Sequence, residues 1–241
     1  MKGIILSGGK ATRLRPCTKV TSKGLLPIYD RPMIYYPLNT LLKAGVKDIL
    51  IIVGPEHAGH YLNLLGSGSQ FNARITYEIQ DEPRGIADAF IIGASFIGDD
   101  NVVMILGDNI FADDLSADIK SFKSGAKIFA KTVPDPERFG VVEVDANGKA
   151  VSIEEKPKNP KSNLCITGLY LYDNRVIEIA KNVKPSSRGE LEITDLHNWY
   201  LEHGELEVAT VNNEWIDTGT FDSLLEAQNL AKTKLKSQMI I

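Results

Sequence analysis

The sequence predicts an α/β fold of Rossmann-like type, in which a mostly parallel central sheet is flanked by helices and joined to a small antiparallel subregion. The first half of the chain alternates short apolar runs with segments of helical period, as parallel strands and crossover helices do. The apolar runs are continuous, which indicates strands that are covered on both faces. After Gly125 the pattern changes to extended segments that include a hairpin turn.

In the first half, apolar runs predict strands, and segments of helical period that end near a glycine predict helices. The expected strands are Gly3–Leu6, Asp48–Val53, Arg74–Ile79 and Val102–Leu106. The expected helices are Met33–Ala44, roughly Gly59–Leu65, and Ile86–Phe96.

The second half is expected to be largely extended, with two late helices. The helix over residues 190–203 is rich in acidic residues at its start, where the helix dipole favours them. In order, the expected segments are Lys127–Val133, a hairpin that turns at Asp145–Gly148, Ile166–Asp173, the helix over 190–203, Leu206–Val211, Trp215–Gly219 and an amphipathic helix from Phe221.

The composition is that of an ordinary globular protein, and it excludes several classes of function. The chain has 241 residues and a formal net charge of -4, which argues against a general nucleic-acid binder. Its two cysteines, Cys17 and Cys165, have no CxxC or histidine nearby, so neither a disulfide framework nor a zinc site is expected. No apolar run approaches the ~20 residues of a membrane span. We therefore expect a cytoplasmic protein without nucleic-acid or membrane partners.

The stretch GIILSGGKATRLRP, from Gly3 to Pro16, places a glycine turn and several cations directly after the first strand. It is not a P-loop, because Ala11 occupies the place of the hydroxyl residue that would hold magnesium. It is not the dinucleotide fingerprint either, because Gly8 and Gly9 are adjacent and no third glycine opens a helix. Bare backbone N–H groups beside cations suit the oxyanions of a nucleoside triphosphate. Solvated surface charge is the alternative for the turn alone.

Lys23, in TSKGLLP, adds a further cation, and from this point the chain resembles a known family. Leu6–Pro16 and Ser22–Pro27 match the family opening, L-[AS]-G-G-x-G-T-R-L-x-P followed by S-K-x-L-L-P. Further family segments follow in order: YDRPMIYYPLNTL, LGDNIF, PERFGVVE, EEKP, KSN, TGLYLYD, RGELEITD and WIDTGTFDSLLEA. Over nearly its whole length the chain is similar to the nucleotidyltransferases that activate sugar 1-phosphates, most closely to the bacterial glucose-1-phosphate thymidylyltransferases.

The resemblance implies a nucleotidyltransferase type A-like fold and a specific reaction. A deoxythymidylyl group passes from dTTP to α-D-glucose 1-phosphate, giving dTDP-glucose and pyrophosphate, and the product would feed deoxysugar synthesis such as that of rhamnose for a surface polysaccharide. Both reactants are anionic, so the protein must screen repulsion, align the groups and stabilise the leaving pyrophosphate. Arg13, Lys23 and Asp108 match the catalytic residues of the family. A planar guanidinium bridges phosphate oxygens, and an ammonium acts as a point charge.

Asp108 and Asp217 match the metal ligands of the family, which implies Mg²⁺ as the cofactor. Asp108 directly follows the apolar strand of NVVMILGD, at the carboxyl end where open α/β folds bind ligands. Two carboxylates together with substrate phosphates form a set that Mg²⁺ accepts. The alternative for Asp108 is the N-cap of a helix over NIFADDL.

The resemblance also assigns the residues that bind the two substrates. The nucleotide contacts are Leu6, Gly8, Gly9, Arg13, Lys23, Gln80, Pro83, Gly85 and Asp108. The Gln80 amide suits the polar edge that thymine shares with uracil, so the base preference stays open. The sugar-phosphate contacts are Asn109, Gly140, Glu155, Lys156, Ile166 and Arg188. A solvated strand end is the alternative for Glu155 and Lys156.

Three residues depart from the family pattern. Ala11 replaces a turn glycine, so the loop must avoid a positive φ there or bear strain. Gly24 replaces a glutamine that follows the catalytic lysine, which removes a nucleotide contact. Phe139 replaces a tyrosine and loses a hydroxyl near the sugar.

The histidines and one aromatic pair carry no family motif. Tyr35 and Tyr36 lie in an apolar helix and are expected in the core. The four histidines form no metal-like cluster and are expected at the surface or with satisfied partners; they are His57, His60, His197 and His203.

We expect a single nucleotidyltransferase domain over residues 1–241, with a nucleotide-binding half over about 1–124, a sugar-binding half over about 125–219 and a C-terminal helix over 220–241. Longer family members carry a further C-terminal helical segment, and the end at Ile241 predicts catalysis without its feedback control, and a homo-oligomer, if one forms, on other surfaces. Two alternatives stay open: a uridylyltransferase or another sugar-1-phosphate nucleotidyltransferase, and a nonenzymatic nucleotide-sugar sensor. Such sensors typically lose the catalytic cations or metal acids, which this chain retains.

Overall fold

The computed structural model describes residues 1–241 and divides them into two compact units. The first unit comprises Met1–Pro83, Met104–Ser121 and Asn213–Ile241, and the second comprises Arg84–Val103 and Phe122–Asn212. These borders differ from the contiguous halves expected from the sequence, because the chain passes between the units more than once.

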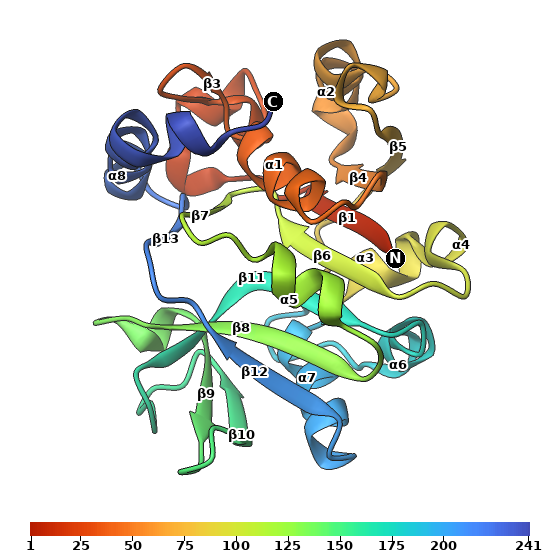
Figure 1. Ribbon diagram of the computed structural model, residues 1–241, viewed down its shortest axis with the longest axis vertical. Coiled ribbons are helices and arrows are strands. Elements are labelled where there is room, and N and C mark those ends of the chain that lie inside the picture. The colour runs from red at the N-terminus through yellow and green to blue at the C-terminus, as the bar shows by residue number, and fades with distance from the viewer. The chain divides into compact units, whose positions relative to one another are not determined.

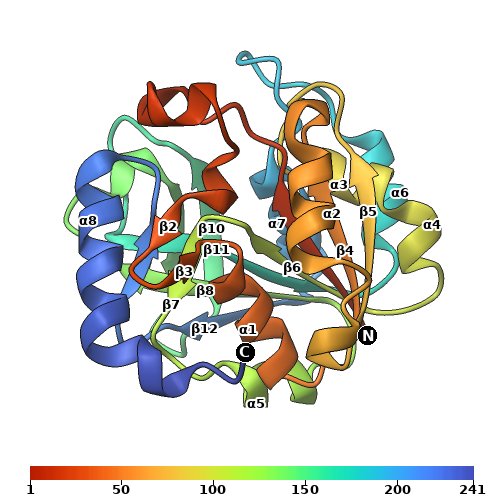
Figure 2. The ribbon, with the colours of Figure 1, turned by 90° about the horizontal axis from the view of Figure 1, so that it is seen from above.

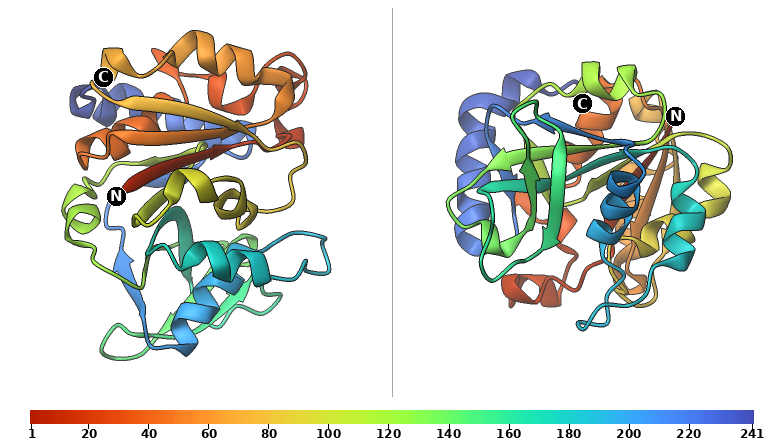
Figure 3. Two further views of the ribbon diagram at one scale, coloured as in Figure 1. Left: turned by 90° about the vertical axis from the view of Figure 1, so that its right-hand side faces the viewer. Right: turned by 90° about the horizontal axis from the view of Figure 1, so that it is seen from below.

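The first unit contains the parallel strands that the apolar runs predicted. β1 (Lys2–Ser7) pairs with β4 (Asp48–Val53), and β4 pairs with β5 (Arg74–Ile79), both in parallel; β6 (Val102–Leu106) is the other neighbour of β1. Figure 3 shows β1, β4 and β5 side by side, coloured red, orange and gold. Successive residues of β4 from Ile49 to Val53 are all buried, so both faces of the strand are covered, as the continuous apolar runs predicted.

Four helices and two short two-stranded ribbons complete the first unit. One ribbon pairs β2 (Pro27–Ile28) with β3 (Arg31–Pro32), and the other pairs β7 (Asn109–Phe111) with β13 (Trp215–Asp217). Figure 2 shows α8 alongside β2 and β3. The helices are α1 (Tyr35–Lys43), α2 (Ala58–Leu65), α5 (Ser116–Ser121) and α8 (Phe221–Leu230), the last of which continues as a π-helical turn over Ala231–Leu235.

The second unit is built on a largely antiparallel arrangement, seen as the green and cyan strands of Figure 1. β11 pairs with β8 and β9, and β9 pairs with β10, all antiparallel, whereas β12 pairs with β8 in parallel. The hairpin between β9 and β10 turns at Asp145, whose Oδ1 accepts hydrogen bonds from the N–H groups of Asn147 and Lys149. The strands are β8 (Ala126–Thr132), β9 (Gly140–Val144), β10 (Ala150–Glu155), β11 (Leu164–Tyr172) and β12 (Leu206–Thr210).

The helices of the second unit correct one prediction from the sequence. The helix expected over Ile86–Phe96 is two shorter helices that meet at Gly93, where glycine weakens the helical continuity. The helices are α3 (Asp88–Ile92), α4 (Ala94–Ile97), α6 (Val176–Asn182) and α7 (Ile193–Glu202). None of the protein's helices has the length and apolar character that crossing a bilayer requires.

Candidate functional site

Buried leucines anchor the two cationic loops of the first unit. Leu14, next to Arg13, has no exposed surface, and Leu26, shortly after Lys23, is almost fully buried. Both leucines belong to an apolar cluster whose other members include Ile28, Met33, Tyr36 and residues of α8. Burying one leucine side chain contributes about 1.5–3 kcal/mol to stability. The two leucines therefore hold the backbones of the loops that carry Arg13 and Lys23.

Lys23 and Asp108 form a mostly buried ion pair in the first unit. The Lys23 ammonium donates a hydrogen bond to Oδ2 of Asp108, and each side chain is 19% exposed. Asn109 Nδ2 donates to the other carboxylate oxygen at 2.9 Å. Burial opposes ionisation of Asp108, but the charge and hydrogen bond of Lys23 and the Asn109 amide outweigh it and lower the pKa of Asp108. Asp108 is therefore a carboxylate that already faces a cation.

The segment WIDTG fixes the backbone around Asp108. The N–H and Oγ1 of Thr218 both donate to the carbonyl of Asp108, at 3.0 and 2.8 Å. The indole N–H of Trp215 donates to Oδ1 of the buried Asn109 at 2.6 Å, which orients the amide that supports Asp108. Asp108 precedes the strand β7 and not a helix, so the N-cap alternative is wrong. Nothing in the sequence pattern marked Trp215 as part of this site.

Arg13 and Asp217 both pack over Gly219. A Cβ placed at Gly219 would lie 2.6 Å from Nη2 of Arg13 and 3.4 Å from Oδ1 of Asp217. The pairing of β13 with β7 sets Asp217 opposite Asn109, the residue after Asp108. The structure thus brings Arg13, Lys23, Asp108 and Asp217 into one unit, with both predicted metal ligands on neighbouring strand ends. The glycine that follows Asp217 in WIDTG was the available but unused signal for this packing.

The predicted base-reading residue lies directly against the glycine turn. Gln80 is 5% exposed, and a Cβ at Gly8 would lie 2.5 Å from its Oε1, so a larger residue at position 8 would displace the Gln80 amide. Gly9 has open space where a Cβ would stand. Leu6 accepts a hydrogen bond from the N–H of Gly107 at 2.8 Å, which ties the end of β1 to the loop that carries Asp108.

Ala11 bears the strain that its departure from the family pattern predicted. Its backbone is left-handed, with φ 44° and ψ 45°. This conformation costs an L-residue roughly 1–2 kcal/mol. Its carbonyl accepts from the hydroxyl of Thr18 at 2.8 Å and from the N–H of Leu14 at 3.1 Å, so the turn that precedes Arg13 is held in place.

Pro83 and Gly85 stand at the border between the two units. Pro83 ends a segment of the first unit, and Gly85 belongs to the second. Gly85 has φ +115°, and a Cβ there would lie 2.5 Å from the backbone N of Leu191. The packing against Leu191 therefore explains this glycine, while nucleotide contact by Pro83 and Gly85 stays a prediction.

In the second unit, the predicted sugar residues gather around Gly140. A Cβ at Gly140 would lie 3.4 Å from Oε2 of Glu155 and 3.6 Å from Cδ1 of Ile166. Nη2 of Arg188 donates to Oε1 of Glu155 at 3.2 Å and to Glu192 at 2.7 Å. Glu155 is therefore not the freely solvated strand end of the alternative interpretation. These acceptors, Glu192 first, raise the pKa of Arg188.

Lys156 is placed by an unusual backbone conformation, and Asn109 belongs to the other unit. Lys156 has φ 45°, its N–H donates to the carbonyl of Phe139 at 3.0 Å, and its Nζ lies 3.6 Å from Oε1 of Glu155. Asn109, the remaining predicted sugar-phosphate ligand, belongs to the first unit, where its amide serves Asp108 and Trp215. A role for Asn109 toward the sugar phosphate stays a prediction.

The histidines correct one expectation. His197 has no exposed surface and stacks on Tyr172 with ring centroids 5.9 Å apart, yet both of its ring nitrogens lack a hydrogen-bond partner. It is therefore neither a surface residue nor a satisfied one. Burial lowers the pKa of His197 to about 3, so it is neutral at physiological pH. Tyr36 is buried, as expected, whereas Tyr35 is only half-buried and makes an edge contact with Phe71.

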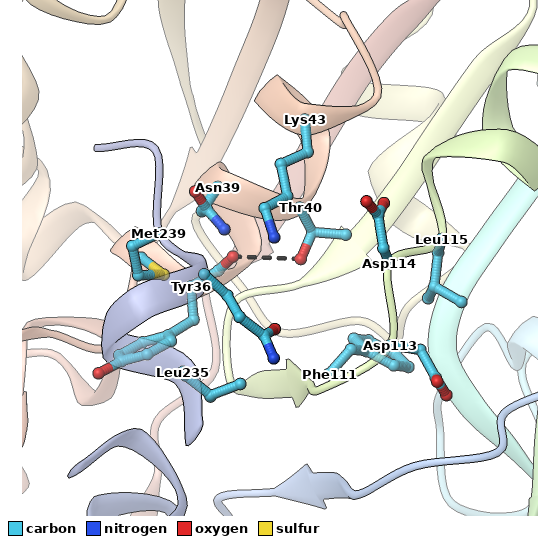
Figure 4. A pocket seen from close by; sticks show the side chains of 11 residues that line it. Tyr36, Asn39, Thr40, Lys43, Phe111, Asp113, Asp114, Leu115, Leu235 and Met239 are labelled. Carbon is cyan, nitrogen blue, oxygen red and sulfur yellow. Dashed lines mark hydrogen bonds between the residues drawn. The ribbon is translucent and has the colours of Figure 1, made fainter. Parts of the chain in front are cut away.

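A separate hollow of the first unit contains none of the predicted site residues (Figure 4). It lies among α1, the segment after β7 and the end of the chain. Within it, Thr40 Oγ1 donates to the carbonyl of Tyr36 at 3.2 Å. Its lining residues are Tyr36, Asn39, Thr40, Lys43, Phe111, Asp113, Asp114, Leu115, Leu235, Gln238 and Met239.

Comparison with known proteins shows to which family the chain belongs. The model of the family described as nucleotidyl transferase matches residues 2–234. The chain belongs to the nucleotidyl transferase family. The glucose-1-phosphate thymidylyltransferase of Neisseria meningitidis serogroup A is 54% identical over 239 residues, which cover 97% of this chain and 83% of that protein. The enzyme of that name from Mycobacterium tuberculosis H37Rv is 51% identical over 243 residues, covering 99% and 84%.

Two solved structures share the fold of this nucleotidyl transferase. A Bacillus anthracis protein assigned as a glucose-1-phosphate thymidylyltransferase, crystallised in complex with a sucrose, is 49% identical, with a TM-score of 0.92 over 97% of this chain and 96% of that chain. A UDP-glucose pyrophosphorylase in complex with UDP-glucose gives a TM-score of 0.84 over 97% and 98%, at 23% identity. The second likeness shows the fold alone. Both agree with an α/β fold that has a mostly parallel sheet flanked by helices and a smaller antiparallel part.

Proposed function

We propose that this nucleotidyl transferase transfers a deoxythymidylyl group from dTTP to α-D-glucose 1-phosphate, releasing pyrophosphate and forming dTDP-glucose. The single observation that carries the proposal is the grouping of Lys23, Asp108, Arg13 and Asp217 in the first unit of a chain that is 51–54% identical to thymidylyltransferases. The uridylyl alternative is not favoured, because the compared relatives at 51–54% identity are named thymidylyltransferases.

The cations of the first unit suit the charge that builds up during in-line phosphoryl transfer. An oxygen of the sugar phosphate forms a bond to the α-phosphorus of dTTP while the bond from that phosphorus to the pyrophosphate oxygen breaks. Arg13 presents a planar fork for the triphosphate oxygens, and Lys23 presents a compact charge for the α-phosphate. No side chain has to act as a nucleophile, because the sugar phosphate is one. The protein contributes alignment and electrostatic stabilisation.

Asp108 and Asp217 would hold Mg²⁺. Their carboxylate oxygens are the hard donors that Mg²⁺ prefers, and the ion pair of Asp108 with the Lys23 ammonium supports a cation at this carboxylate. No group of three or more His, Cys, Asp or Glu residues suited to a metal ion occurs in the chain. A pair of carboxylates therefore leaves the remaining positions to phosphate oxygens and water. When bound, the ion neutralises phosphate charge and polarises the phosphorus. Lys23 would then turn from Asp108 to the phosphate.

The second unit would bind the sugar phosphate. Glu155, beside Gly140 and Ile166, supplies a carboxylate that can accept hydrogen bonds from vicinal hydroxyls. Arg188 and Lys156 lie near that carboxylate and supply the positive charge that a sugar phosphate needs. We therefore propose that the first unit binds the nucleotide and the second the sugar, within one nucleotidyltransferase domain.

Base selection would rest on Gln80. Its amide offers a donor and an acceptor to the polar edge of thymine, and its place against Gly8 fixes it at the end of β5. The choice of thymine over uracil depends on one methyl group, which is worth about 1–3 kcal/mol in a fitted pocket.

The proposal is tested by pyrophosphate release with α-D-glucose 1-phosphate, Mg²⁺ and each of dTTP, UTP, CTP, ATP and GTP. We expect the highest kcat/KM with dTTP, and its loss in Lys23→Ala but not in Lys19→Ala, which removes an exposed lysine of the same loop region. A highest rate with UTP would make the protein a uridylyltransferase. If none of the five nucleotides gives pyrophosphate release, although the protein is folded and binds dTDP-glucose, the result would favour the nonenzymatic sensor.

A further inference from the structure

The hydroxyl of Tyr61 is the hub of a buried hydrogen-bond network at the candidate site. Tyr61 lies on α2 and has no exposed surface. Its hydroxyl oxygen is 2.6 Å from Oγ of Ser7 and 2.8 Å from Oγ of Ser22. A phenol has one proton to donate and can also accept hydrogen bonds, so it can donate to one serine and accept from the other. The backbone of Gly24 packs against the same oxygen, because a Cβ at Gly24 would collide with it.

The Tyr61 hydroxyl lies against both neighbours of Lys23. Ser22, which precedes the lysine, is hydrogen-bonded to it, and Gly24, which follows the lysine, has no room for a Cβ beside it. Lys23 itself begins a 3-10 turn, in which Leu26 N–H donates to the carbonyl of Lys23 at 3.0 Å. The backbone on both sides of Lys23 is therefore packed against one buried oxygen atom.

The same network reaches the loop of Asp108 through Ser7. A Cβ at Gly107 would lie 2.9 Å from Oγ of Ser7, and a Cβ at Gly24 would lie 2.8 Å from the same atom. The Ser7 hydroxyl therefore lies between the residue after Lys23 and the residue before Asp108. A shift of the Ser7 and Tyr61 hydroxyls is therefore expected to change the distance between the loop of Lys23 and the loop of Asp108.

We infer that Tyr61 is a positioning residue, which holds Lys23 and Asp108 in the relative geometry that nucleotidyl transfer needs. The inference rests on the proposed function of Lys23 and Asp108. It also accounts for Gly24, which stands where the resembled family has glutamine: a Cβ there would collide with the Tyr61 and Ser7 hydroxyls. Glycine at 24 and a tyrosine hydroxyl at 61 are thus complementary.

The first test compares Tyr61→Phe with a matched control, Tyr200→Phe. Tyr200 lies on α7, has no exposed surface, and donates its hydroxyl proton to Oδ1 of Asp173 at 2.9 Å. Both changes remove one buried hydroxyl, so both are expected to lower the thermal midpoint to a similar extent. We expect Tyr61→Phe to lower kcat about 10- to 100-fold with less than a threefold change in the KM of dTTP, because a misplaced group acts in the transition state. A kcat within twofold of the wild type would overturn the inference.

A second variant tests whether positions 24 and 61 share one contact. Gly24→Ala forces a methyl group against the Ser7 and Tyr61 hydroxyls and is expected to lower kcat like Tyr61→Phe. Removal of the phenol hydroxyl makes room for that methyl, so the double variant is expected to be no slower than the slower single variant. If the loss in kcat of the double variant equals the product of the two single losses, the two residues act separately, and this result would contradict the inference.

A third measurement does not depend on turnover. In brief acetylation of the folded protein followed by peptide mass spectrometry, Lys23 is expected to react at least fivefold faster in Tyr61→Phe than in the wild type, because its pairing with Asp108 is loosened. Lys19 serves as the internal reference. Equal Lys23 reactivity in the two proteins would overturn the positioning role. If the wild type releases no pyrophosphate, the proposed function fails, and this measurement still decides whether Tyr61 places Lys23.

Discussion

The contact between Gly219 and the Arg13 guanidinium gives a quantitative test of the site. In Gly219→Ala the new Cβ would stand 2.6 Å from Nη2 and 3.1 Å from Cζ of Arg13. An ordinary contact needs about 3.4 Å or more, so the guanidinium must retreat by about 0.8 Å. Arg13 is exposed and flexible, so the protein accommodates the shift with little loss of stability. A displacement of about 1 Å at a reacting group can cost about 100-fold in rate, or about 2.7 kcal/mol of transition-state stabilisation.

The assay is the kcat/KM for dTTP, measured by pyrophosphate release, with urea unfolding as a check on stability. Gly59→Ala is the matched control, because Gly59 is exposed on α2 and a Cβ there meets nothing within 4 Å. The control is expected to keep full activity and to gain about 0.5–1 kcal/mol of stability from better helix propensity. A Gly219→Ala protein with wild-type kcat/KM would refute the placement of Arg13 in the reaction.

Three further predictions concern separate parts of the molecule. In the unfolded chain His197 takes up a proton below pH 6.5, while in the folded protein it stays neutral to about pH 3, so the free energy of unfolding falls by about 2 kcal/mol between pH 6.5 and 5. In urea unfolding, His197→Leu should therefore lose less stability over this pH range than the wild type. An equal loss in both proteins would contradict the prediction. Glu155→Gln should raise the KM of glucose 1-phosphate about 10-fold and leave that of dTTP unchanged, since a charge-assisted hydrogen bond is weakened; the reverse pattern would place Glu155 with the nucleotide. Asp108→Asn should lower kcat at least 100-fold and raise the Mg²⁺ concentration needed for half-maximal rate, and an unaltered Mg²⁺ titration would exclude Asp108 as a ligand.

The sequence predicted the parallel strands closely because their signal is local. β4, β5 and β6 have the expected bounds, since β4 and β6 are almost wholly apolar and β5 alternates polar with apolar residues, as strands do. The helix over Ile86–Phe96 was predicted as continuous although it contains Gly93, where the structure divides it into two helices. The change of pattern after Gly125 lies close to the border between Ser121 and Phe122, but the other borders between the two units depend on which segments pack together.

The residues of the candidate site likewise differ in whether the sequence could identify them. Asp108 and Gln80 follow strands, and Lys23 lies in a family motif, so the sequence could identify all three, and the structure adds how each is held. The roles of Trp215 and Tyr61 could not be predicted, because each acts through residues distant in the sequence. The indole of Trp215 orients Asn109, and the phenol of Tyr61 is hydrogen-bonded to Ser7 and Ser22. Such contacts join elements that only the folded chain brings together.

The central claim is that an oxygen of glucose 1-phosphate attacks the α-phosphorus of dTTP. It is tested most directly with glucose 1-phosphate that carries ¹⁸O in its three terminal phosphate oxygens, followed by mass spectrometry of both products. The account predicts that all of the label stays in dTDP-glucose and that the released pyrophosphate is unlabelled. Label in the pyrophosphate, or a labelled product that contains no thymidylyl group, would contradict it.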